Sequence, residues 1–298
     1  MTRPILLVGD NPFLGISHLS QERARGRSRS PSTSGAAAEI VIAGVENGAD
    51  GFMFSLGDTT LSILEEVGKR MSLDGLKLVP LIPYAYDWVR LATFNGGVFG
   101  IGRQYARRLV QSVDAHALWH GAQGLLRADI AEMLSSYVAL ELRRLKKVQG
   151  GAQVTAVMLH EVLTDLALAL NLEDIFRKYV GLLRSRGIRP GLETRNFALL
   201  VQRLREWRID TGTLWIAAPF NRAGFQMTAS RIDCERALAS LPGGVVIAMS
   251  IFAAGYLSRR DAIEYVQQLP HLGGVVVGVS SVSQAQETFR MLRRVLGK

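Results

Sequence analysis

The chain of 298 residues contains one cysteine, Cys234, and no signal-peptide-like apolar core at its N-terminus. A single cysteine excludes an internal disulfide framework and suits a reducing compartment. No apolar stretch reaches about 18 residues without a charge or a turn, so the sequence predicts neither a membrane span nor export. We therefore expect a cytoplasmic protein.

Aromatic residues make up only 7% of the chain, and acidic residues (26) are fewer than basic ones (35), which leaves a net charge of +9. The basic residues are scattered along helical segments and are not interleaved with aromatics, which argues against nucleic-acid binding. Two interpretations of the charge stay open: solvated helix faces, or a site for a phosphorylated or otherwise anionic ligand. We expect a small-molecule, anionic substrate, and an oligomer is compatible with this composition.

Hydrophobic residues make up 48% of the chain, and no linker marks its middle, so we expect one domain over residues 1–298. Short apolar runs alternate with amphipathic helical segments. The predicted strands are 5–8, 51–55, 76–82, 154–159, a segment ending at Glu193, 214–218, 244–250 and 274–278. Eight strands alternating with helices predict an α/β fold, a (β/α)8 TIM barrel, with a doubly wound open sheet as the alternative.

Two places depart from a regular alternation. Pro80 removes a backbone donor from the third strand, so we expect that strand to be irregular or bulged. Residues 88–127 exceed an ordinary βα connection and are interrupted by several glycines. We predict a helical insertion there, between strands 3 and 4, that shapes a substrate pocket or an oligomer contact.

Polar residues follow the apolar runs, at the strand ends that share one mouth in a parallel barrel. His160 and Glu193 are suited to act there as an acid–base pair. Mixed carboxylates and imidazoles would also suit a divalent metal that polarises a carbonyl. The residues at such positions are Asp10, Asn11, His18, Asp58, His160, Glu161, Glu193 and Asn221.

Four stretches, roughly within residues 128–298, resemble the aldo-keto reductases. Residues 157–160, VMLH, match the strand that carries that family's active-site histidine. Residues 183–197, LRSRGIRPGLETRNF, are similar to a helix end and the strand that follows it. Residues 246–257, VIAMSIFAAGYL, and 275–287, VVVGVSSVSQAQE, look like the seventh and eighth strands with their exit loops.

The resemblance implies an oxidoreductase acting on a small carbonyl or alcohol with NADP or NAD. Its catalytic tetrad is Asp, Tyr, Lys and His, and only His160 has a matching position. Met53 or Phe54 stands where the aspartate is expected, and the third strand ends without a lysine. Tyr84 is a candidate for a relocated proton donor. We take His160, Glu193, Tyr84 and Asp10 as the candidate catalytic residues.

A helix that starts after Gly278, Ser280 and Ser281 offers amides and hydroxyls to a phosphate. NAD(P) would place its phosphate there, a sugar phosphate would satisfy the same site, and the serines would equally suit a simple helix cap. The cofactor candidates are Asn196, Ser250, Gly278, Ser280 and Ser281. The substrate candidates are Asn11, His18, Arg195, Asn221 and Arg222.

Three hypotheses follow. The first is a nicotinamide-dependent, aldo-keto-reductase-like enzyme with a rearranged proton donor. The second is a non-redox lyase or isomerase that uses His160 and Glu193, with or without a divalent metal, on a phosphate-bearing substrate. The third is an inactive barrel retained for binding, with the insertion as its partner surface.

Overall fold

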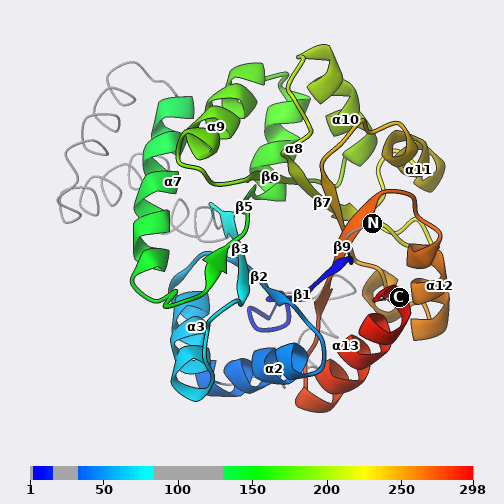
Figure 1. Ribbon diagram of the computed structural model, residues 1–298. Helices are drawn as coiled ribbons and strands as arrows, with labels where there is room; N and C mark the ends of the chain where they lie inside the picture. The colour runs from blue at the N-terminus through cyan, green and yellow to red at the C-terminus, as the bar shows by residue number, and fades with distance from the viewer. Residues whose placement is uncertain (1–2, 16–32, 84–129, 298) are drawn as a thin grey trace.

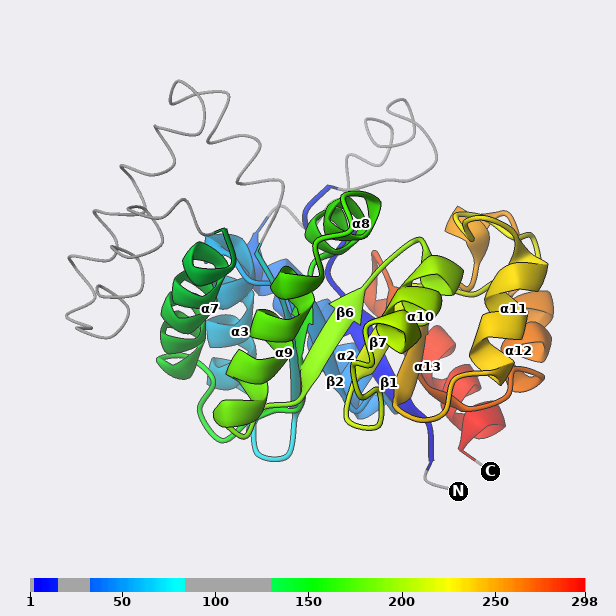
Figure 2. The same ribbon diagram turned by 90° about the horizontal axis from the view of Figure 1, so that it is seen from above.

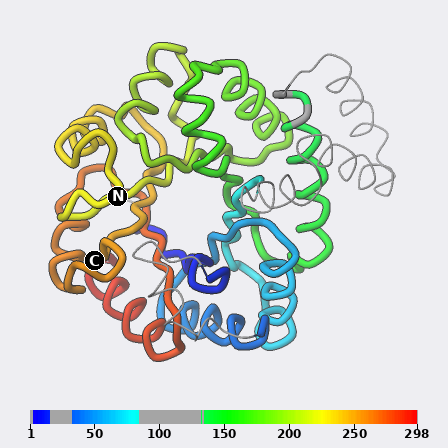
Figure 3. Tube along the Cα trace, turned by 180° about the vertical axis from the view of Figure 1, so that it is seen from behind, coloured from blue at the N-terminus to red at the C-terminus, as the bar shows by residue number. Residues whose placement is uncertain are grey.

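The computed structural model describes residues 3–15, 33–83 and 130–297, and its strands form a closed parallel barrel (Figures 1 and 3). Neighbouring strands pair in the order β2-β1-β9-β8-β7-β6-β5-β3-β4, and a β2–β3 pairing closes the ring. The predicted (β/α)8 barrel is confirmed. The strands are β1 (Ile5–Gly9), β2 (Gly51–Ser55), β3 (Lys77–Ile82), β4 (Gln153–Val154), β5 (Val157–Leu159), β6 (Pro190–Glu193), β7 (Trp215–Pro219), β8 (Val245–Met249) and β9 (Leu272–Gly278).

Helices surround the barrel between successive strands (Figure 1). Their bounds are α2 (Ser34–Glu46), α3 (Asp58–Arg70), α7 (Ile130–Lys146), α8 (Glu161–Ala169), α9 (Glu173–Ser185), α10 (Phe197–Glu206), α11 (Arg231–Ala239), η1 (Ala253–Gly255), α12 (Arg259–Gln267) and α13 (Val282–Leu296). None of the helices in the described ranges is long and apolar enough to cross a membrane. The predicted insertion at 88–127, together with Tyr84 and His18, lies outside the described residues.

The expected irregularity at Pro80 lies in the neighbouring strand instead. β3 pairs with β2 in unbroken register, with Phe54 opposite Pro80. On the other side of β3, Lys77 and Leu78 pair with β4, and Leu81 and Ile82 pair with β5. Between these two pairings, the segment that joins β4 to β5 contains one residue more than β3 does. The prediction of a bulge in β3 itself was therefore wrong. This extra residue lies opposite Pro80, which has no main-chain N–H to donate to the neighbouring strand.

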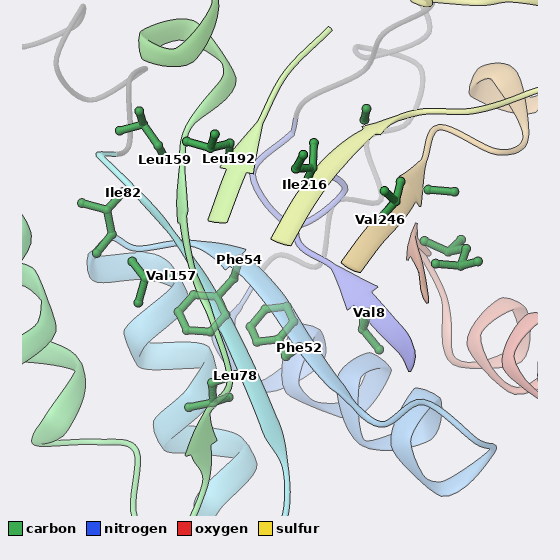
Figure 4. Close-up of a cluster of buried hydrophobic side chains, with 14 of the residues drawn as sticks. Val8, Phe52, Phe54, Leu78, Ile82, Val157, Leu159, Leu192, Ile216 and Val246 are labelled. Carbon is green, nitrogen blue, oxygen red and sulfur yellow. The ribbon is translucent and has the colours of Figure 1, made fainter. Parts of the chain in front are cut away.

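The core has two layers, because alternate residues of each strand point to opposite faces. Outside the barrel, apolar side chains pack against the helices (Figure 4). Phe52 and Phe54 of β2 stack there with ring centroids 4.7 Å apart. Inside the barrel, a smaller cluster that includes Met53, Met158 and Trp215 fills the lumen. Full burial of each large apolar side chain stabilises the fold by about 1.5–3 kcal/mol, so the barrel is a rigid support for its mouth.

The connection between β5 and β6 contains two helices, α8 and α9. His160 is the N-cap of α8, and its Nδ1 accepts a hydrogen bond from the main-chain N–H of Val162 at 3.2 Å. Asn171, with a positive φ of 53°, separates α8 from α9. Figure 2 shows α8 beside the C-terminal end of β6. This additional helix therefore brings polar side chains to the barrel mouth.

Candidate functional site

Asp10 follows β1 and is 5% exposed. Its Oδ2 accepts the main-chain N–H of Ser55, the last residue of β2, at 2.7 Å. Burial raises the pKa of this carboxyl from its ordinary value to about 6, against the opposing effect of the Ser55 hydrogen bonds. Asp10 therefore changes protonation close to neutral pH.

Glu193 ends β6 and is 9% exposed. Its Oε2 accepts the main-chain N–H of Glu161 at 3.2 Å. Burial raises the pKa of Glu193 well above its ordinary value, and the charges of Glu161 and Asp10 raise it further, while Arg195 acts in the opposite direction. Glu193 thus keeps its proton in a pH range where an exposed glutamate would be ionised, as a general acid requires.

His160 is 5% exposed at the end of β5. Burial lowers the pKa of its imidazole, and nearby Arg195 lowers it too, while Glu161 opposes both. Since Nδ1 accepts a hydrogen bond from Val162, the neutral ring carries its proton on Nε2. In this tautomer Nε2 is a neutral donor.

Arg195 forms a bidentate ion pair with Glu161, which lies in the first turn of α8. Its Nε and one terminal nitrogen donate to the Glu161 carboxylate at 2.8 and 2.6 Å. Both side chains are largely covered, with relative exposures of 30% and 14%. This geometry fixes the guanidinium more tightly than a single contact would.

A second contact between α8 and β6 involves Asp165. Its carboxylate accepts the hydroxyl of Thr194 and the main-chain N–H of Arg195. Thr194 Oγ1 in turn accepts the main-chain N–H of Asn196 at 2.9 Å. The residues that follow Glu193 are consequently held in place by α8. Sequence reasoning missed Asp165 and Thr194; the available signal was that Glu161 and Asp165 share one face of a helix at i,i+4 spacing.

The cofactor candidates lie at the exits of β6, β8 and β9. Ser281 is the N-cap of α13 and accepts the N–H of Gln284 at 3.2 Å, while the Gln284 side chain accepts the N–H of Ser280 at 2.9 Å. These two contacts resemble a capping box, except that Gln284 reaches the residue before the N-cap. A Cβ added to Gly278 would lie 2.9 Å from the ring of Pro12, so packing alone requires a glycine there.

The exit loop of β8 has an unusual backbone. Ser250, Ala253 and Ala254 all have a positive φ, between 46° and 57°. Such conformations cost about 1–3 kcal/mol each for residues with a side chain and cluster at ligand sites. The strained loop lies at the exit of β8, and the first turn of α13 at the exit of β9 is exposed. Asn196, the remaining cofactor candidate, is the N-cap of α10 and also donates to Asp165.

The substrate candidates on the β7 side differ in their surroundings. Asn221 is fully buried, and its side-chain amide holds the loop after β7 through both the carbonyl and the N–H of Phe225. Arg222 lies at the rim, 3.7 Å from Asp261. Asn11 is exposed beyond β1. Among these residues, Arg222 and Asn11 are placed where a ligand could reach them.

Within the described ranges, no three His, Cys, Asp or Glu side chains are arranged to hold a metal ion. The carboxyls and the imidazole of the mouth are instead engaged with main-chain N–H groups and with Arg195. These hydrogen bonds and the ion pair fix the positions of the carboxyls and of the imidazole in the mouth.

Comparison with known proteins places the fold. No family model matches the sequence, and no curated protein matches it. Two solved chains from Pseudomonas aeruginosa, each provisionally classed as an aldo-keto reductase, match 99% of this chain and 92% of their own, with TM-scores of 0.58 and 0.59 at 14% and 13% identity. An aldo-keto reductase from a deep-sea metagenome library of the Medee basin matches the same shares at a TM-score of 0.50 and 9% identity. The chain therefore has the barrel fold of the aldo-keto reductases.

Proposed function

We propose that this protein is an enzyme that transfers a proton to or from a small carbonyl or alcohol substrate in the barrel mouth, with Glu193 as the proton donor. The observation that carries the proposal is the buried carboxyl of Glu193, which ends a barrel strand and lies close enough to Asp10 for their charges to interact. Perturbed carboxyls at the C-terminal ends of barrel strands are typical of catalytic acids.

In the reductive direction, Glu193 donates its proton to the substrate carbonyl oxygen, and the resulting carboxylate is stabilised by the N–H of Glu161 and the nearby charge of Arg195. His160 orients the same oxygen through Nε2–H. Asp10 keeps negative charge close to Glu193 and so favours its reprotonation. Glu193 thereby replaces the tyrosine that the aldo-keto reductases use, and Tyr84 remains a second candidate for that role.

A nicotinamide cofactor would supply the hydride that reaches the carbonyl carbon. Ser250, Gly278, Ser280 and Ser281 would hold its phosphates at the exits of β8 and β9, and Asn196 would face it from the exit of β6. Arg195, Arg222, Asn11 and His18 are the candidates for binding an anionic substrate, whereas the buried Asn221 holds the loop after β7.

A second candidate function is a non-redox isomerase or lyase that uses the same acid. It is favoured by the pairing of two buried titratable side chains, His160 and Glu193, at the ends of the neighbouring strands β5 and β6, because such a pair can move a proton without a nicotinamide. In this alternative, Glu193 and His160 move a proton between atoms of a phosphate-bearing carbonyl substrate, and the first turn of α13 binds the substrate phosphate.

The test compares the wild-type protein with Glu193→Gln on a panel of small aldehydes, ketones and sugar phosphates. Consumption of NADPH or NADH follows the redox reaction by absorbance, and proton exchange in D2O without nicotinamide follows the non-redox reaction by NMR. We expect turnover in one arm and a loss of about 100-fold or more in Glu193→Gln, because amides cannot donate an acidic proton. Glu264→Gln, on the outer face at α12, is the matched control.

Undiminished turnover in Glu193→Gln would assign the acid elsewhere, with Tyr84 tested next. Turnover in neither arm, together with no binding of nicotinamide or of sugar phosphates, would favour the inactive barrel.

A further inference from the structure

The N-terminal half of α8 contacts the exit of β6 through Glu161 and Asp165. The N–H of Glu161 donates to Glu193, the carboxylate of Glu161 binds Arg195, and Asp165 accepts the N–H of Arg195. One residue of α8 therefore contacts the carboxyl of Glu193 through its main chain and the neighbouring cation through its side chain.

We propose that Glu161 and Arg195 are positioning residues for Glu193: their ion pair fixes one negative and one positive charge beside this carboxyl and so sets the pH range in which it holds its proton. This inference rests on the proposed role of Glu193 as the acid.

The ion pair places one negative and one positive charge near the buried carboxyl of Glu193. The Glu161 carboxylate favours the protonated form of Glu193, and the Arg195 guanidinium favours the ionised form. Because both ion-pair contacts are 2.8 Å or shorter and both side chains are largely covered, neither charge can move away without breaking the pair. The described charges that act on Glu193 are those of Asp10 after β1, Glu161 on α8 and Arg195 after β6. His160 after β5 and Asp165 on α8 interact in turn with Glu161 or Arg195.

The pair differs from an ordinary surface salt bridge. Glu264 and Arg260, an i,i+4 pair on α12, have exposures of 42% and 87%. Such exposed pairs contribute little, because water screens them. The Glu161–Arg195 pair is better covered and adjoins a buried acid, so its charges act at short range with less screening.

The proposal is tested by NMR titration of the protein carrying 13C-labelled glutamate, with the Glu193 signal identified by its loss in Glu193→Gln. We expect Glu161→Gln to lower the titration midpoint of Glu193 by about one pH unit, because a negative charge is removed and the main-chain N–H contact is kept. We expect Arg195→Met to raise the midpoint by a similar amount, because a positive charge is removed. Arg195→Lys keeps the charge and should leave the midpoint nearer to that of the wild type.

The opposite signs distinguish positioning from a merely structural role. If the pair only kept water out, both substitutions would let water reach Glu193 and both would lower its midpoint. A fall in Arg195→Met, or no shift in either variant, would therefore overturn the proposal. The pair Glu264→Gln and Arg260→Met serves as the control and should leave the midpoint unchanged.

The titration does not depend on activity, so the two proposals fail separately. Opposite shifts combined with full turnover in Glu193→Gln would leave the electrostatic role intact and remove the catalytic one. Absent shifts combined with lost turnover in Glu193→Gln would do the reverse.

Discussion

Asp10 follows β1 and Glu193 ends β6, on opposite sides of the barrel, and the charge of Asp10 raises the pKa of Glu193 across the mouth. Asp10 accepts the main-chain N–H of Ser55, and Glu193 accepts the main-chain N–H of Glu161. Both groups are buried, so their interaction is screened less than it would be at the surface. The mouth thus holds two carboxyls whose proton affinities depend on each other.

The first prediction concerns Asp10→Asn. The pKa of Asp10 is raised from 3.8 to about 6 in the folded protein, so its contribution to stability is present below about pH 4 and is lost as the pH rises to about 6. The asparagine can still accept the Ser55 N–H. We expect the stability of the variant relative to the wild type to rise by about 3 kcal/mol between about pH 4 and pH 7. Urea unfolding across this range measures the difference, and a pH-independent difference would contradict it.

The second prediction concerns His160. Because burial lowers the pKa of His160 below 6.5, the wild-type protein should lose stability as the pH falls through and below that value. His160→Asn keeps an N-cap acceptor for Val162 and should remove this loss. His160→Ala should also remove it but should be less stable than His160→Asn by about 1 kcal/mol at every pH. Thermal unfolding of the three proteins at several pH values measures these differences. An equal loss of stability in all three proteins as the pH falls would show that His160 is not involved.

The third prediction separates the helix cap of α13 from cofactor binding. Ser281→Ala removes the acceptor for the Gln284 N–H and should cost about 1 kcal/mol of stability. Ser281→Asp keeps a cap, so its stability should stay near that of the wild type, but its charge should repel a phosphate and weaken NADPH binding about 10-fold or more. Fluorescence titration with NADPH measures the affinity. Equal affinity of the wild type and Ser281→Asp would place any nicotinamide away from α13.

The fourth prediction concerns the buried link between β6 and α8. Thr194→Val removes the donor to Asp165 and the acceptor for the Asn196 N–H. We expect a loss of about 2 kcal/mol, because buried polar groups are left without a partner. Thr194→Ser keeps the hydroxyl and serves as the control. Faster amide hydrogen exchange at Asn196 in Thr194→Val, with no change in Thr194→Ser, would locate the effect; equal stability of both variants would contradict it.

Some features were readable from the apolar runs alone. The runs predicted as strands are strands in the structure, except that the run at 154–159 is divided into β4 and β5, because a strand buried on both faces is continuously apolar. The polar residues after these runs, including Asp10, His160 and Glu193, lie at one end of the barrel because all strands are parallel.

Other features were not readable. Pro80 indicated an irregular ladder, but the strand that absorbs it depends on which neighbour the proline faces, and pairing alone decides this. Similarly, Arg195 suggested an anion site, whereas its described partner is Glu161 on α8. A local sequence pattern does not show which distant side chain completes an ion pair.

The sequence by itself therefore determined the alternation of barrel strands with helices and the end at which polar side chains gather, because both follow from local periodicity. Only the tertiary structure decided that Asp10 and Glu193 interact across the mouth, and that α8 holds Glu193 and Arg195 together. The physical reason is that closing the ring buries carboxyls from distant parts of the chain in one enclosure, where burial and mutual charge reset their proton affinities.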